Sequence, residues 1–97
     1  MNFLENIKIK FAISRITKME KLFDDLKFSF EKSKEEFYKN KNLQRKLKVL
    51  TNYYENGKWL KDYQLDEENL LPKNLKREIL SQDGIYNFLS EVENREV

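Results

Sequence analysis

The stretch that decides the fold is residues 9–37, IKFAISRITKMEKLFDDLKFSFEKSKEEF, in which apolar side chains recur at alternating spacings of three and four. This seam consists of Ile9, Ala12, Ile16, Met19, Phe23, Leu26, Phe30, Ser33 and Phe37. A sustained heptad repeat is typical of a helix that packs at a shallow angle against another helix. We therefore predict one long helix over residues 1–39, with an apolar stripe widened by Leu22, Phe28 and Tyr38.

The N-terminal end of this helix carries two opposing signals. Asn2 followed by Glu5 is typical of a capping box, which satisfies the free amides at a helix start. Residues 7–11 instead alternate with period two, as a strand would. We favour helix because a lone strand has no partner within this chain, and a strand paired across a dimer is the alternative.

The length of the predicted helix indicates a second copy of the chain. A helix over residues 3–39 would be about 55 Å long, whereas a compact chain of this size has a radius of gyration of about 13 Å. The remaining elements can cover the seam from Met19 to Phe37 but not its N-terminal end. Either the helix breaks near Ser14 or another chain covers that end. We expect a homodimer that buries Ile7, Ile9, Phe11, Ile13 and Ile16.

The rest of the chain is also predicted to be helical. A second helix over residues 43–56 presents Leu43, Leu47, Leu50 and Tyr54, and Gly57 ends it. Residues 58–97 are expected to form a compact cap of short helices. The cap comprises an amphipathic stretch over 58–65, a polar loop over 66–69, a helical piece opened by Pro72, and a final helix capped by Ser81. We thus predict a single all-α domain over 1–97, in which the long helix and the second helix form an antiparallel hairpin.

Composition excludes several classes of protein. Two glycines and one proline leave little material for the turns of an all-β fold. The absence of histidine and cysteine rules out Ser-His and Cys-His nucleophile pairs and the usual zinc sites. Gly57 and Gly84 stand alone, so there is no phosphate-binding loop. For these reasons we expect no enzymatic activity and no cofactor. We also expect no membrane contact and a cytoplasmic location, because the longest apolar run near the N-terminus is only residues 11–13.

Two charged clusters suggest alternative functions. Asp62 and Asp66 lie one helical turn apart and could hold a magnesium or calcium ion, or pair with Lys58, Lys61 or Arg77. We favour pairing, with Arg77 bound to Asp62 or Asp66. A basic patch without acidic residues could contact the phosphates of a nucleic acid, although a solvated helix face is the favoured interpretation. This patch consists of Lys39, Lys41, Arg45, Lys46 and Lys48.

The aromatic residues Tyr53, Tyr54, Trp59, Tyr63 and Tyr86 cluster near the end of the second helix and in the segment after it. They indicate either a small core of amphipathic rings, which we favour, or a groove for a protein partner. We expect Trp59 to be buried against the second and final helices. The candidate interaction or structural cluster is Tyr53, Tyr54, Trp59, Asp62, Tyr63, Asp66, Arg77, Asp83 and Tyr86.

The C-terminal half resembles a family of small bacterial proteins catalogued as domain of unknown function 4298. The resemblance rests on Tyr53-Tyr54, Trp59, Asp62-Tyr63, Asp66-Glu67, Leu71-Pro72, Leu75-Lys76-Arg77, Leu80-Ser81, Asp83-Gly84, Tyr86-Asn87 and Leu89. The chain departs from the family pattern at Asn74 and Glu78, and by this resemblance residues 1–13 are expected to be an N-terminal extension beyond the family core. The resemblance implies a bacterial cytosolic setting and carries no activity with it. A protein-interaction or self-association module is therefore the leading hypothesis, with nucleic-acid binding and metal dependence as alternatives.

Overall fold

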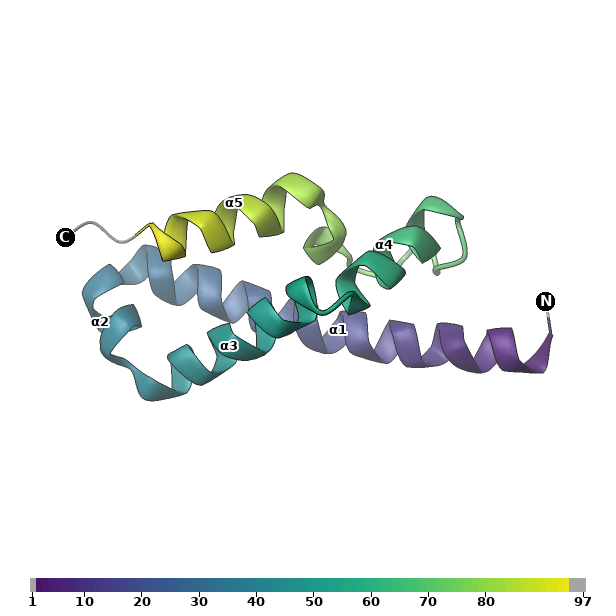
Figure 1. Cartoon of the computed structure of the whole chain (residues 1–97), viewed down its shortest axis with the longest axis horizontal. Coiled ribbons are helices and arrows are strands. Elements are labelled where there is room, and N and C mark those ends of the chain that lie inside the picture. The colour runs from purple at the N-terminus through teal and green to yellow at the C-terminus, as the bar shows by residue number, and fades with distance from the viewer. Residues whose placement is uncertain (1, 95–97) are drawn as a thin grey trace.

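The computed structural model describes residues 2–94, and every regular element in that range is helical, as predicted (Figure 1). The order is α1 (Phe3–Lys32), α2 (Lys34–Lys39), α3 (Lys41–Glu55), α4 (Lys58–Glu67), the 3-10 helix η1 (Glu78–Leu80) and α5 (Gln82–Glu93). The central helix is α1, against which α2, α3, α4 and η1 pack. Figure 1 shows α3 running antiparallel to α1, with α5 beside the C-terminal half of α1. The molecule measures 51 × 24 × 22 Å.

The heptad seam forms one wall of the core. Its buried members are Ala12, Ile16, Met19, Phe23, Leu26, Phe30 and Phe37. The rings of Phe23 and Phe30 meet Phe88 of α5 edge to face, with centroids 5.5 and 5.9 Å apart. The expectation that Phe28 widens this stripe is wrong, since its side chain is 57% exposed. Residues two positions apart point away from each other on a helix, so Phe28 cannot share a face with Leu26 and Phe30.

The long helix ends at Lys32, earlier than predicted, at a corner formed by Ser33. This residue has extended backbone, its N–H donates to the Ser29 carbonyl, and its hydroxyl accepts from the Glu36 N–H. Asn40 forms the next corner, where its side chain accepts from the Leu43 N–H at 3.0 Å. The two side-chain caps, one on each side of α2, thus reverse the chain and lay α3 back along α1.

Other local predictions are confirmed. The Asn2 side chain accepts from the Glu5 N–H at 2.8 Å, and residues 7–11 are helical. Gly57 adopts a left-handed conformation with φ of 91° between α3 and α4, where a side chain would be strained. Ser81 caps α5 through its hydroxyl, which accepts from the Gly84 N–H. The second helix begins at Lys41, two residues before the predicted start.

The prediction of a helical piece opened by Pro72 is wrong. After α4 ends at Glu67, the chain crosses α1 as an irregular segment, residues 68–77, with only η1 before α5. Asn69 takes the left-handed conformation, φ 59°, and lets the Leu70 N–H reach the Leu65 carbonyl at 3.0 Å. The Pro72 carbonyl accepts from the Leu75 N–H at 3.1 Å and from the Arg77 side chain at 2.7 Å, so a local turn and one side chain take the place of a helical ladder there. None of the described helices combines the length and apolarity needed to cross a membrane.

Candidate functional site

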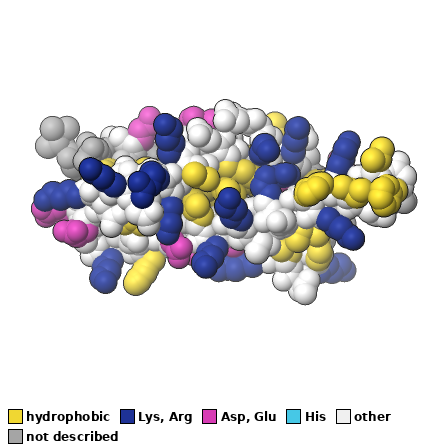
Figure 2. Space-filling model, turned by 90° about the horizontal axis from the view of Figure 1, so that it is seen from below, with side chains coloured by type: hydrophobic (Ala, Val, Ile, Leu, Met, Phe, Trp, Pro, Cys, Tyr) yellow, Lys and Arg dark blue, Asp and Glu magenta, His cyan; other side chains and the backbone are white. Residues whose placement is uncertain are grey.

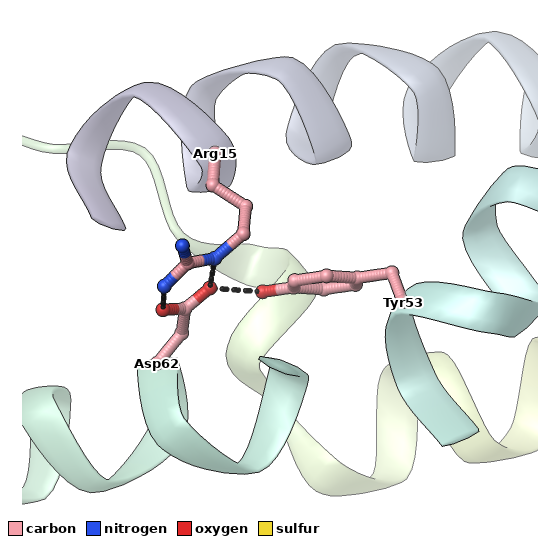
Figure 3. A network of polar contacts seen from close by, with 3 residues as sticks. All are labelled: Arg15, Tyr53 and Asp62. Atoms are coloured by element: carbon pink, nitrogen blue, oxygen red, sulfur yellow. Dashed lines mark hydrogen bonds and ion pairs between the residues drawn. The ribbon is translucent and has the colours of Figure 1, made fainter. Parts of the chain in front are cut away.

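A fully buried carboxylate lies at the junction of α1, α3 and α4 (Figure 3). Asp62 of α4 has no exposed surface, and its two oxygens accept hydrogen bonds from two other elements. The Arg15 guanidinium binds both oxygens, with Nε donating to Oδ2 at 2.9 Å and Nη2 donating to Oδ1. The Tyr53 hydroxyl donates to Oδ2 at 2.7 Å. The sequence placed Tyr53 and Asp62 in one cluster, but it did not indicate Arg15.

The charges of this network compensate one another. The hydrogen bond to Asp62 raises the pKa of Arg15, against the opposing effect of burial. Burial raises the pKa of the Tyr53 hydroxyl, and the hydrogen bond to Asp62 adds to that shift. The tyrosine therefore stays protonated and acts as a donor. With three donors on its oxygens and no path to solvent, Asp62 acts as a structural anchor and not as a general base.

The aromatic cluster is a stack of rings beside this network. Trp59, only 6% exposed, lies parallel to Tyr63 and edge-on to Tyr54, each at a centroid distance of 5.2 Å. The indole N–H donates to the Ile79 carbonyl at 2.8 Å. Trp59 is thus buried and contacts the second helix through Tyr54, as expected, and its hydrogen bond joins α4 to η1, which precedes the final helix. Tyr86 of α5 is 59% exposed and lines a surface groove together with Tyr54 of this stack.

Arg77 was predicted to pair with Asp62 or Asp66, and the structure confirms the pair with Asp66. The Arg77 Nε lies 2.9 Å from Asp66 Oδ1, and Nη1 donates to the Pro72 carbonyl at 2.7 Å. Both charged side chains are about 30% exposed, so the pair lies at the edge of the surface. Asp83 lines the same shallow surface hollow as Arg77. Since both Asp62 and Asp66 are bound by arginines, the arrangement argues against a metal ion between these two carboxylates.

The predicted basic patch divides into paired and free cations. Lys39 lies 2.7 Å from Glu35, and Lys46 lies 3.9 Å from Asp25. Lys41, Arg45 and Lys48 are exposed on one face of α3 and form no ion pair within residues 2–94. In the view of Figure 2, Lys and Arg side chains outnumber acidic ones over the face of the molecule seen from below.

The predicted dimer surface is only partly available. Ile16 has no exposed surface, because the core of the same chain buries it, so its assignment to a dimer surface is wrong. Ile7, Ile9 and Ile13 are half-buried, and Phe11 is 67% exposed. The helix continues without a break through Ser14. Figure 2 shows hydrophobic side chains gathered at the end of the molecule where α1 begins.

Four residues that matter here were not predicted from the sequence. Phe3 and Leu4 are 76% and 65% exposed and extend the apolar end of α1. The sequence could have indicated them, because they are apolar residues directly after the Asn2 cap. Arg15 and Glu20 are polar residues of α1 that pair across the fold, with Asp62 and with the Ile79 N–H respectively. Their partners lie 47 and 59 residues away, and no local pattern indicates them.

Comparison with known proteins identifies the family but no activity. The profile of the family described as Domain of unknown function (DUF4298) matches residues 16–96. No curated protein and no solved structure matches the chain. Several residues behind the family resemblance, among them Trp59, Asp62, Asp66 and Arg77, are held in contacts within the fold. Because the family profile matches residues 16–96 of the 97 residues, the chain belongs to the DUF4298 family.

Proposed function

We propose that this protein is a non-enzymatic interaction module that self-associates through the exposed apolar end of α1, residues 3–11. The observation that carries the proposal is the exposure of three large apolar side chains within the first three turns of the helix: Phe3 at 76%, Leu4 at 65% and Phe11 at 67%. Large exposed apolar patches mark interaction sites in soluble proteins. The half-buried Ile7 lies between them on the same face of the helix, whereas Ile9 lies on the opposite face, in line with the buried Ala12 and Ile16.

The polar residues that could perform chemistry support the non-enzymatic part of the proposal. Asp62 is enclosed and saturated with donors, and Asp66 is paired with Arg77. A catalytic carboxylate needs access to a substrate and a free oxygen. The residue types that usually act as nucleophile and base, cysteine and histidine, are absent from the sequence.

The expected strength of association follows from the exposed area. Burying a Phe or Leu side chain completely stabilises by about 1.5–3 kcal/mol, and these three are about two thirds to three quarters exposed. Two copies would then gain about 6–12 kcal/mol, against about 4–15 kcal/mol lost when two molecules are immobilised. At the favourable end of both ranges, about 12 kcal/mol gained against about 4 kcal/mol lost, the net of about 8 kcal/mol corresponds to a weak dimer that dissociates at roughly micromolar concentration, and we expect no tighter association.

The experiment is sedimentation velocity of the whole chain across roughly 1–200 µM, a range that brackets micromolar dissociation. We expect a concentration-dependent shift from monomer to dimer, abolished by Phe3→Ser with Phe11→Ser. Phe28→Ser is the matched control, because Phe28 is an exposed phenylalanine of the same helix outside the proposed surface. A monomer at every concentration, or equal loss of dimer in the Phe28 variant, would show that this surface does not mediate self-association.

A second candidate function, nucleic-acid binding, is favoured by one observation. Lys41, Arg45 and Lys48 share an exposed face of α3 and have no acidic partner within the described part of the chain. If this face contacts phosphates, binding of random-sequence RNA or DNA must weaken steeply with salt. Arg45→Ala with Lys48→Ala should then reduce the slope by about two charges. Salt-independent or undetectable binding would remove this candidate.

A further inference from the structure

Three carboxylates converge where η1 crosses α1. Glu20 and Asp24 lie one turn apart on α1, and Glu78 is the first residue of η1. One oxygen from each lies within 4.8 Å of the other two. Glu20 is buried, Asp24 is half-buried and Glu78 is exposed, so the cluster extends from the interior to the solvent. Like charges this close repel one another unless a cation or a proton lies between them.

An unsatisfied oxygen distinguishes this cluster from an ordinary acidic surface. Glu20 lies more than nine-tenths buried, since the residue is only 4% exposed. Its Oε1 accepts from the Ile79 N–H at 2.9 Å, whereas Oε2 is buried without a hydrogen-bond partner among the described residues. Burial raises the pKa of Glu20, and the charges of Asp24 and Glu78 act in the same direction. A buried carboxylate oxygen without a donor is costly, and a bound cation would satisfy it.

We propose that Glu20, Asp24 and Glu78 bind a hard divalent cation, with calcium as the best fit. All the ligand atoms are carboxylate oxygens, which calcium, magnesium and manganese prefer over softer metals. One oxygen of each carboxylate lies within 4.8 Å of the other two, close enough for the three side chains to approach one ion. Calcium accepts irregular coordination at about 2.3–2.6 Å, whereas magnesium requires near-ideal octahedral geometry at about 2.0–2.1 Å. A site built from three separate side chains on two elements therefore favours calcium.

Water can complete the coordination from the adjacent surface groove. This groove, of about 460 Å³, is lined by Glu20 and Asp24 from α1 and by Asn74, Leu75 and Lys76 from the irregular segment. Three protein oxygens leave three or more positions of a calcium ion for water, so we expect weak binding, with a dissociation constant of about 0.1–1 mM. An ion here would tie η1 to α1 at the end of the irregular segment.

Lys76 is the competing cation in the structure. Its Nζ lies 2.7 Å from Asp24 Oδ2, and its side chain is 60% exposed, so it can move into solvent. Lys27 lies 3.7 Å from the other oxygen of Asp24. Calcium must displace the Lys76 ammonium group from Asp24 or share the carboxylate with it. The site therefore predicts antagonism between Lys76 and the ion, which a cluster of independent surface charges would not show.

The test is calcium binding to the full chain, measured by isothermal titration with CaCl₂ and by thermal unfolding in EDTA or in calcium. At calcium about tenfold above the dissociation constant we expect the Tm to rise by several degrees. Glu20→Gln and Glu78→Gln should each weaken calcium binding by more than about tenfold, while Glu31→Gln, an exposed acid of α1 outside the cluster, should not. Lys76→Ala should strengthen it by about fivefold or more.

The pattern across these variants decides the proposal. Glu78 is exposed, so its glutamine variant is expected to fold even if the Glu20 variant does not. Absence of calcium binding up to about 10 mM, ten times the weakest expected constant, in both the native chain and Lys76→Ala would overturn the site. So would binding that Glu78→Gln leaves unchanged, or binding that Lys76→Ala leaves unchanged or weakens.

Discussion

Replacing Arg15 by alanine should strongly destabilise the fold, because it strands the buried charge of Asp62. Asp62 has no exposed surface, and the Arg15 side chain is 25% exposed. Removing one partner from a buried pair costs about 3–5 kcal/mol, whereas a surface pair contributes about 0–1 kcal/mol. The partial exposure of Arg15 lets water reach the vacated space, which places the expected loss near the lower bound, at about 3 kcal/mol. Domains of this size have a total stability of about 5–15 kcal/mol.

The loss can be measured by urea unfolding followed through Trp59, the one tryptophan of the chain. Its ring lies on α4, the helix that carries Asp62, so its fluorescence reports the affected junction. Circular dichroism of the helices provides a second probe, and coincident transitions would justify a two-state analysis. A loss of about 3 kcal/mol should lower the Tm by roughly 12–24 °C. Lys18→Ala, at an exposed position of the same helix as Arg15, should change stability by less than about 0.5 kcal/mol.

The double variant Arg15→Ala with Asp62→Asn separates a stranded charge from lost packing. The neutral amide that replaces the Asp62 carboxylate would still accept from the Tyr53 hydroxyl without leaving a buried charge, so the double variant should be more stable than Arg15→Ala alone. If Arg15→Ala costs less than about 1 kcal/mol, the pair behaves as a surface ion pair and the reasoning is wrong. A double variant that is less stable than either single variant would also refute it.

Three further outcomes are expected. Trp59→Ala should cost about 3–5 kcal/mol, and Trp59→Phe about 1–3 kcal/mol by leaving the Ile79 carbonyl unpaired; a Trp59→Phe loss below about 0.5 kcal/mol in urea unfolding followed by circular dichroism would argue against a role for that hydrogen bond. Arg77→Ala should cost under about 1 kcal/mol, since its pair with Asp66 is partly exposed; calorimetry would detect a larger loss. Burial raises the pKa of Glu20 above its ordinary 4.5, so protonation of Glu20 stabilises the fold at pH 4.5 and below, and this contribution is lost as the pH rises through the raised pKa. In EDTA, Glu20→Gln should therefore raise the Tm at pH 7 and make the Tm depend less on pH. A Tm that depends on pH as in the native chain would contradict this prediction.

Local signals predicted most of the elements but conflicted at one corner. The heptad spacing continues through Ser33 to Phe37, and on that basis the helix was expected to run on to Lys39. Ser33 and Glu36 also have the spacing of a capping box, and the Ser33 hydroxyl does accept from the Glu36 N–H. The seam remains intact because Phe37 still packs edge to face with Phe30, at 5.1 Å, after the corner. Apolar periodicity alone therefore cannot distinguish a continuous helix from two helices that share a core.

The candidate site was predictable in part. Asp66 with Arg77 and the burial of Trp59 follow from residues close together in sequence, within a segment that must fold back on itself. Glu20 resembles any other exposed acid of an amphipathic helix until η1 covers it and donates the Ile79 N–H. A helical pattern assigns a residue to a face, but it does not say which later segment will cover that face.

Local sequence signals are enough to predict that this protein is helical, that caps lie at Asn2, Gly57 and Ser81, and which stripe of α1 enters the core. These features depend on backbone hydrogen bonding and on periodicity within a few turns. The pairing of Arg15 with Asp62 and the position of Glu20 beneath η1 follow from the three-dimensional packing alone. Those contacts join residues 47 and 59 positions apart, and they depend on how α4 and the irregular segment pack across α1, which the packing of the whole core selects.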